Sequence, residues 1–221
     1  MLKLYLKKKF YQITKNFRIS NCAGKTLLFL WVKKDLSTLK GSIGLDLAGG
    51  NMSNKRFFFT DKYICLDINQ SKLDVGFERN PDAIAINCRI EEFLNDKSQS
   101  KADVILCVQT MGTNIHFDIN NTIDVVELMY NFLNKDGSMI FNIGIKAGDL
   151  SILKKKIFEK LDKKFKFIDC RFYGAFHTKT KSIWYNRIIF LLAILMNIFS
   201  PLRTMFGTKV EKIYFYCYKK L

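Results

Sequence analysis

Two acidic residues and a run of small residues that follows the first of them are the part of this sequence best suited to binding a ligand. Asp46 precedes Ala48, Gly49 and Gly50, and Asp67 follows 21 residues after Asp46. Small residues let the backbone turn sharply and approach a ligand closely. A carboxylate has enough acceptor sites for both hydroxyls of a ribose. The pattern predicts a nucleoside site formed by the loop after Leu47 and by Asp67.

Both acids stand at the ends of apolar runs that are typical of buried strands. Alternating strand and helix patterns continue along the chain to residue 172 and predict a doubly wound, parallel α/β sheet. Asp46 and Asp67 are then one strand-helix-strand step apart. The expected strands are 42–47, 63–67, 83–87, 102–108, 138–143, 165–172 and 212–218, and the expected helices are 71–77, 90–94, 122–133 and 150–161. In such a sheet, ligands bind beyond the carboxyl ends of the strands, where both acids are expected.

Two kinds of nucleotide site compete for this loop. A dinucleotide fingerprint requires G-x-G-x-x-G, which is absent, and Asp46 would place negative charge near a pyrophosphate. The run 46–52, Asp-Leu-Ala-Gly-Gly-Asn-Met, instead resembles motif I of the class I S-adenosylmethionine-dependent methyltransferases, D/E-x-G-x-G-x-G. Their cofactor carries positive charge and no phosphate, so that an acid nearby is favourable. Further stretches resemble later motifs of the family in order, over residues 43–145.

The resemblance implies a seven-stranded, mostly parallel sheet with an antiparallel last strand, and S-adenosylmethionine as the cofactor, with no metal. The cofactor-binding residues that it implies are Asp46, Ala48, Gly49, Gly50, Asp67, Ile68, Asn87, Cys88, Val108 and Gln109. Ala48 and Met52 stand where the family has glycines, and Asn87 where it often has an acid. These departures leave open a non-catalytic protein of the same fold that serves as a binding module or scaffold.

The sequence gives less information about the group that would accept the methyl group. A hydroxyl or amine acceptor benefits from a general base, and His116, which follows the fourth strand, is the candidate. A solvated loop histidine is the alternative for His116, and the same holds for His177.

Positive charge is concentrated at the two ends of the chain, whose net charge is +16. Residues 1–40, expected to form a basic helical extension, carry net +9, and residues 151–221 carry +12, whereas residues 41–150 carry −5. This asymmetry indicates an anionic partner such as a membrane surface, nucleic acid or phosphorylated substrate. A Lys-rich codon bias is the alternative.

Within the expected domain, residues 41–221, the connection 173–211 is unusually long and contains an apolar run at 188–199. Twelve helical residues span about 18 Å, whereas a bilayer core needs about 30 Å. The run therefore predicts either a buried helix or a helix lying in a membrane interface, since Trp184, Tyr185 and basic residues flank it.

This tail is similar to that of methyltransferases of surface-polysaccharide and lipid-linked glycan pathways. The resemblance implies methyl transfer to a small-molecule, glycan or lipid-linked acceptor, and we expect the protein to be peripheral on an anionic membrane. An RNA methyltransferase is the alternative within the class, although no Pro-Pro-Tyr motif follows the fourth strand. The six cysteines form no C-x-x-C pair, so we interpret them as reduced and the protein as cytoplasmic. The oligomeric state is left open.

Overall fold

The structure, a computed structural model, describes residues 23–111, 119–146, 150–161, 165–172, 183–198 and 210–219. Its contacts group the chain into two compact units, residues 1–31 with 172–208 and residues 32–171 with 209–221. The second unit contains the sheet and the predicted nucleoside site.

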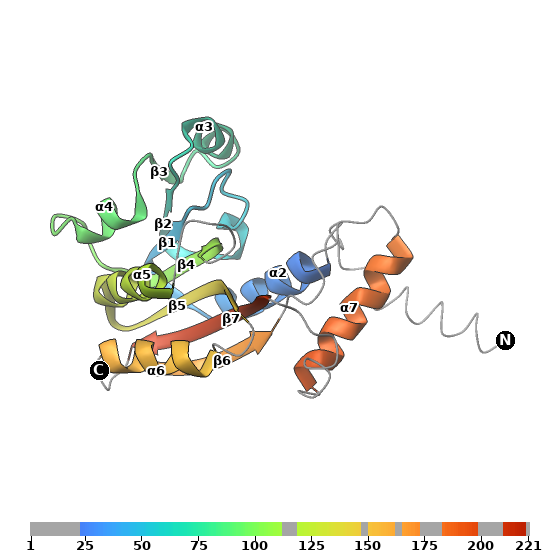
Figure 1. Ribbon diagram of the computed structural model, residues 1–221. Coiled ribbons are helices and arrows are strands. Elements are labelled where there is room, and N and C mark those ends of the chain that lie inside the picture. Colours follow the sequence, from blue (N-terminus) through green and yellow to red (C-terminus); the bar gives the residue numbers. More distant parts are fainter. Residues whose placement is uncertain are drawn as a thin grey trace. The chain divides into compact units, whose positions relative to one another are not determined.

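One seven-stranded sheet has the order β3-β2-β1-β4-β5-β7-β6 (Figure 1). The strands are β1 Lys40–Leu47, β2 Phe59–Leu66, β3 Ile84–Ile86, β4 Ala102–Met111, β5 Leu133–Lys146, β6 Phe165–Phe172 and β7 Val210–Lys219. The pairs β1–β2, β1–β4, β2–β3 and β4–β5 are parallel, and β7 runs antiparallel to β5. The doubly wound sheet that the alternation predicts is confirmed, as is the antiparallel last strand.

The helices occupy the connections that the sequence pattern indicates, with one exception. They are α2 Ala23–Leu36, α3 Gln70–Arg79, α4 Ile90–Asn95, α5 Ile119–Phe132, α6 Leu150–Lys160 and α7 Ile183–Ile198. The apolar run of the long connection lies in α7, which belongs to the first unit. None of the helices in the described ranges is long and apolar enough to cross a membrane.

The strand-helix-strand step expected between Asp46 and Asp67 is wrong, because the connection contains only the 3₁₀ turn η1, Lys55–Phe57. Its aromatic residues pack where a helix would lie. Phe57 is buried, and the Phe58 ring meets Tyr63 edge-on at 5.0 Å between centroids. Phe58 also lies against Gly44, where an added Cβ would approach the ring to 2.5 Å. An aromatic run without helical spacing thus closes a crossover shorter than the usual βαβ unit.

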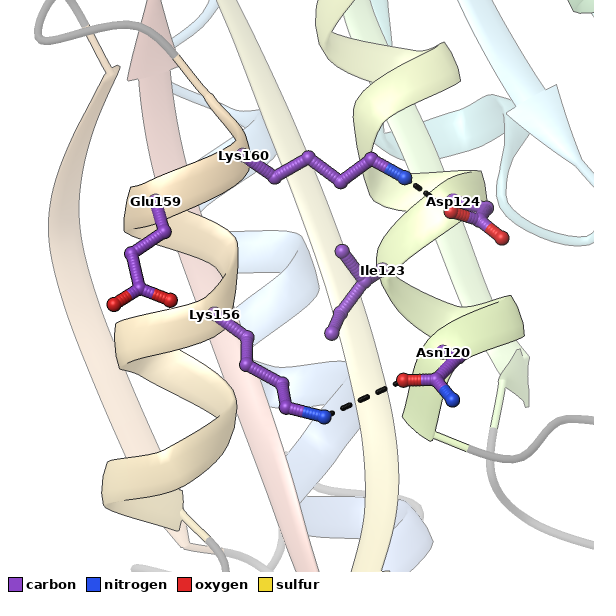
Figure 2. A pocket seen from close by; sticks show the side chains of 6 residues that line it. All are labelled: Asn120, Ile123, Asp124, Lys156, Glu159 and Lys160. Atoms are coloured by element: carbon purple, nitrogen blue, oxygen red, sulfur yellow. Dashed lines mark hydrogen bonds and ion pairs between the residues drawn. The ribbon is translucent and has the colours of Figure 1, made fainter.

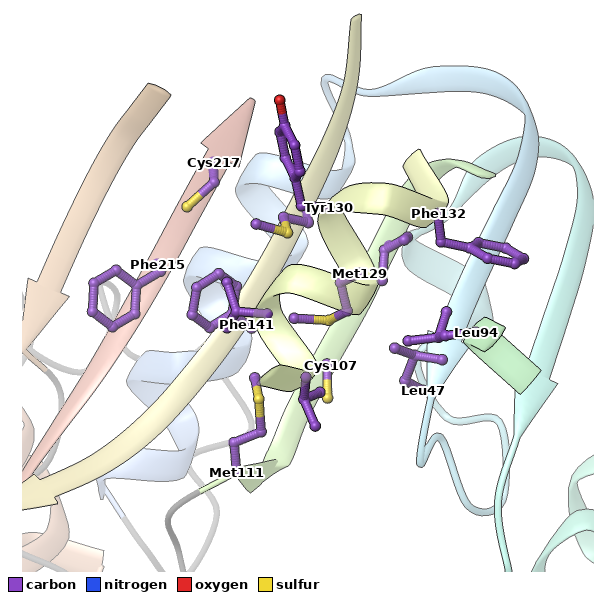
Figure 3. Packing of buried hydrophobic residues seen from close by; sticks show 14 of the residues in the cluster. Leu47, Leu94, Cys107, Met111, Met129, Tyr130, Phe132, Phe141, Phe215 and Cys217 are labelled. Atoms are coloured by element: carbon purple, nitrogen blue, oxygen red, sulfur yellow. The ribbon is translucent and has the colours of Figure 1, made fainter. Parts of the chain in front are cut away.

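The two faces of the sheet differ in chemistry because side chains alternate along each strand. One face packs against α4, α5 and α6 in a continuous apolar core (Figure 3). Leu45 and Leu47 of β1 belong to this core, as do Phe141 of β5 and Phe215 of β7, whose rings stack at 5.0 Å. A ring pair of this kind contributes about 1 kcal/mol beyond its buried area. The opposite face carries the buried polar residues of the alternate positions, Asp46, Asn142 and Tyr214.

Candidate functional site

The loop after β1 has the backbone conformation that a glycine-rich loop requires, although only two of its residues are glycine. Ala48, Gly50 and Met52 have φ values of 55°, 55° and 56°. These are the three positions of the glycines in the D-x-G-x-G-x-G pattern. A non-glycine residue in this left-handed region costs about 1–2 kcal/mol. The loop therefore keeps its conformation against the preference of Ala48 and Met52.

Contacts within and below the loop explain how this conformation is held. The Gly49 N–H donates to the Leu66 carbonyl at 3.0 Å, which ties the loop to the end of β2. A Cβ on Gly49 would lie 2.5 Å from an Asp46 carboxylate oxygen and 2.7 Å from the Cys65 Sγ. Gly49 is thus required by close packing over Asp46. Met52 is buried and packs with Tyr63, Cys65, Leu73 and Ala83.

Asp46 lies beneath the loop and is fully buried. The Tyr63 hydroxyl donates to its Oδ2 at 2.6 Å, and the Asn54 Nδ2 donates to the same oxygen at 3.1 Å. Burial raises the pKa of Asp46 to about 7, an effect that these hydrogen bonds reduce and the charge of Asp67 reinforces. Burial, followed by the charge of Asp46, raises the pKa of the Cys65 thiol to about 12. Cys65 is therefore a protonated thiol and no nucleophile at neutral pH.

Asp67, directly after β2, faces the loop. Its Oδ2 accepts from the Gly50 N–H at 2.9 Å, and its Oδ1 accepts from the Asn69 N–H at 2.9 Å. Each oxygen keeps a second lone pair that can accept a ligand hydroxyl. Ile68 beside it is 74% exposed and offers an apolar surface. The loop and the acid predicted to form one site are thus in direct contact.

The remaining predicted residues surround this pair with different degrees of contact. The Asn87 side chain, which follows β3, donates to the Asp67 carbonyl at 3.0 Å. Cys88 is half-buried and packs against the apolar core. Val108 and Gln109 follow Cys107, which pairs with Leu47 of β1, so that they lie beside the start of the loop. His116 and His177 lie outside the described residues.

Asn54, Tyr63 and Asn142 were not predicted as members of this region. Tyr63 and Cys65 alternate with apolar residues on β2, which places both on the face that carries Asp46. That alternation is a signal in the sequence, but it does not reveal which polar group meets which. Asn54 lies in the turn before η1, where no periodic pattern indicates its burial.

A surface pocket of about 490 Å³ lies elsewhere, between α5 and α6 (Figure 2). Its lining residues are Asn120, Ile123, Asp124, Lys156, Glu159 and Lys160. Lys156 donates to the Asn120 Oδ1 at 3.4 Å, and Lys160 pairs with Asp124. These lysines already pair across the two helices, so that the pocket presents mixed charge and none of the predicted site residues.

In the described ranges, no group of three or more His, Cys, Asp or Glu side chains could hold a metal ion.

Comparison with solved structures identifies the fold. No protein-family model and no curated protein sequence matches the chain. The N-methyltransferase NodS from Bradyrhizobium japonicum WM9 matches with a TM-score of 0.57 at 9% identity, over 90% of this chain and 97% of NodS. The plantazolicin methyltransferase BamL, solved with a triazolic desmethylPZN analog and S-adenosylhomocysteine (SAH), matches with 0.55 at 10% identity, over 100% and 92%. The chain therefore has the class I methyltransferase fold.

The same fold also serves another reaction. The cyclase SpnF matches with a TM-score of 0.55 at 8% identity, over 88% of this chain and 80% of SpnF. Because one fold hosts different chemistries, the reaction of this chain must be argued from its own site.

Proposed function

We propose that this chain binds S-adenosylmethionine against the loop 48–52 and Asp67, and transfers its methyl group to a polar acceptor. The hydrogen bond between the Gly50 N–H and Asp67 carries the proposal, because it joins the two halves of the predicted nucleoside site at 2.9 Å. Left-handed φ values at all three glycine positions of the motif support it.

The residues present suit a positively charged nucleoside. The free lone pairs of Asp67 suit the two ribose hydroxyls, and the exposed Ile68 side chain suits one face of the base. Asp46 places a carboxyl group below the loop without a basic side chain in salt-bridge distance among the described residues. A cation bound above it would be favoured and would also favour the ionised carboxyl.

When bound, S-adenosylmethionine supplies an electrophilic methyl group on a cationic sulfur. The protein's contribution is alignment, since holding two reactants in line accounts for much of such a rate enhancement. Asp67 and the loop 48–52 would fix the nucleoside, and the end of β4 would form the neighbouring wall. We keep His116, in the segment between β4 and α5, as the candidate base for a hydroxyl or amine acceptor.

Calorimetry with SAH tests the proposed site. The unmodified chain is expected to bind SAH, and Asp67→Ala is expected to weaken binding by about 10- to 100-fold, the loss of one charge-assisted hydrogen bond. Asp61→Ala is the matched control, because Asp61 is an exposed aspartate at the other end of β2. If the unmodified chain does not bind SAH, the catalytic proposal is wrong and a non-catalytic binding module is favoured.

We further propose that α7 brings the site to a glycan or lipid-linked acceptor at an anionic membrane. Ile188, Leu191 and Leu195 recur at helical spacing on α7 and are 55%, 40% and 41% exposed. The helix contains no acidic residue, and basic residues flank it in the sequence. An apolar stripe between basic flanks favours insertion into an anionic lipid interface.

Liposome flotation tests this second proposal. The chain is expected to float with vesicles that contain anionic lipid and to float less with neutral ones. Ile188→Gln/Leu191→Gln should abolish flotation, whereas Ile152→Gln/Phe158→Gln on α6, where the side chains are about as exposed, should not. Equal failure of the unmodified chain with both vesicle types contradicts the proposal, and retarded RNA in a mobility-shift assay at moderate salt would then favour an RNA acceptor.

A further inference from the structure

The end of β4 contains an irregularity beside the proposed cofactor site. β4 and β5 pair in register from Val104 and Ser138 to Cys107 and Phe141, and pairing resumes at Met111 and Ile143. β4 therefore contains more residues than β5 over this stretch and bulges outward. Within the bulge, Gln109 has a φ of 64° and an exposed side chain. A residue with this conformation persists only where its surroundings hold it.

Asn142 of β5 is the residue that meets this bulge. The Gln109 N–H donates to the Asn142 Oδ1 at 2.6 Å. Asn142 is fully buried on one face of the sheet. Its neighbours Phe141 and Ile143 are buried on the other face, in the apolar core. Burying an amide is unfavourable unless its polar atoms are hydrogen-bonded. The Gln109 N–H satisfies the amide oxygen of Asn142 at this buried position.

The bulge and the loop after β1 lie next to each other. Leu47 pairs with Cys107 on the neighbouring parallel strand, so that Ala48, the first residue after β1, lies at the level of Val108. The backbone at 108–109 would therefore form a wall of the proposed nucleoside site, on the β4 side of the loop 48–52. A change in the φ of Gln109 would move this wall.

We infer that Asn142 is a positioning residue, which holds Gln109 in its left-handed conformation and so fixes the wall of the nucleoside site opposite Asp67. The inference rests on the proposed function, since that function supplies the ligand. Asn142 acts through the backbone of Gln109 and makes no contact with the ligand itself.

A purely structural role for Asn142 makes a different prediction. If Asn142 only stabilises the sheet, substitutions at Gln109 will not affect ligand binding in a way that follows backbone preference. If Asn142 acts through Gln109, glycine at 109 will compensate for its loss, because glycine adopts a positive φ without strain. Valine at 109 will imitate its loss, because a β-branched residue is strongly disfavoured there.

The experiment measures SAH affinity by calorimetry for five variants, one of which is Gln109→Gly alone. Asn142→Leu is expected to weaken SAH binding about tenfold, which corresponds to about 1.4 kcal/mol. The double variant Asn142→Leu/Gln109→Gly is expected to bind SAH within about threefold of the unmodified chain, a difference of about 0.7 kcal/mol. Gln109→Val should weaken binding as Asn142→Leu does. Ser138→Ala is the control, because Ser138 is a buried polar residue on the same face of β5 at its far end, and should leave affinity unchanged.

The NMR chemical shift of the Gln109 amide proton gives a second measurement beside the SAH affinities. The Gln109 amide proton should resonate downfield in the unmodified chain and move upfield in Asn142→Leu. Equal SAH affinity of a folded Asn142→Leu and the unmodified chain overturns the inference, as does a failure of Gln109→Gly to restore binding. Should Asn142→Leu not fold, equal affinities of Gln109→Val and Gln109→Gly overturn it instead. If the unmodified chain does not bind SAH, that result contradicts the proposed function and is distinguishable from the results that overturn this inference.

Discussion

Two buried aspartates of the sheet-containing unit each accept a hydrogen bond from a tyrosine, yet their surroundings differ. Tyr63 donates to Asp46 at 2.6 Å below the ligand loop, and Tyr214 of β7 donates to Asp35 of α2 at 2.5 Å. Asp35 has a cation close by, since the Arg171 Nη1 lies 3.7 Å from its Oδ2. Asp46 is flanked by the neutral Asn54 and by a second acid, Asp67.

The difference separates a scaffold position from a ligand position. Arg171 compensates the charge of Asp35 within the protein, which suits a permanent connection between α2 and the sheet. At Asp46 no such compensation is present in the described residues, and burial raises the pKa to about 7. A carboxyl group in that state is stabilised in its ionised form by a cationic ligand. Under the proposed function, the cationic cofactor would bind above this uncompensated acid.

The largest expected effect is a pH dependence that comes from Asp46. A carboxyl whose pKa is higher in the folded than in the unfolded chain stabilises folding only while it is protonated. Its contribution is full below the unfolded pKa near 3.8 and is lost as the pH rises to about 7. Between pH 4 and 8, the free energy of unfolding should fall by as much as about 4 kcal/mol from this group.

Asp46→Asn removes that titration. Urea unfolding at several pH values should show the difference in unfolding free energy between the variant and the unmodified chain shifting in favour of the variant as the pH rises. A difference that stays constant between pH 4 and 8 would show that the two aspartates do not differ as described.

The second prediction concerns the compensated acid. Asp35→Ala leaves the Tyr214 hydroxyl without its buried acceptor and Arg171 with Asp169 as its remaining carboxylate. We expect a loss of about 3 kcal/mol in unfolding free energy. SAH affinity should stay unchanged in the folded variant. Thermal unfolding measures the stability of the variant, and calorimetry measures its SAH affinity. A selective loss of SAH binding would contradict a scaffold role for Asp35.

The smallest expected effect comes from backbone conformation above Asp46. Ala48→Gly relieves a positive φ and should raise the unfolding free energy by about 1 kcal/mol. Gly50→Ala is the matched opposite: its Cβ would have no neighbour closer than 3.5 Å, so that a loss of similar size would come from the φ of 55°. If denaturant unfolding gives equal stability for both variants, the loop does not store the strain that we assign to it.

The elements of the fold follow closely from sequence patterns, because burial imposes a period on each. The apolar alternation at 165–172 predicts β6 with the same limits that the structure has. The prediction of a helix between β1 and β2 fails, because Phe57 and Phe58 pack without helical periodicity.

The sequence by itself determined the order of the strands and most of the connecting helices, the glycine-like loop and the position of Asp67 at a strand end, since each depends on local residue types and spacing. Only the tertiary structure decided that Asp46 lies under Tyr63 and Asn54, that Asp35 has Arg171 as a neighbour, and that Asn142 meets Gln109. These contacts join residues from different elements. Their energies depend on burial and partner charge, which the register of the sheet sets and which no local pattern encodes.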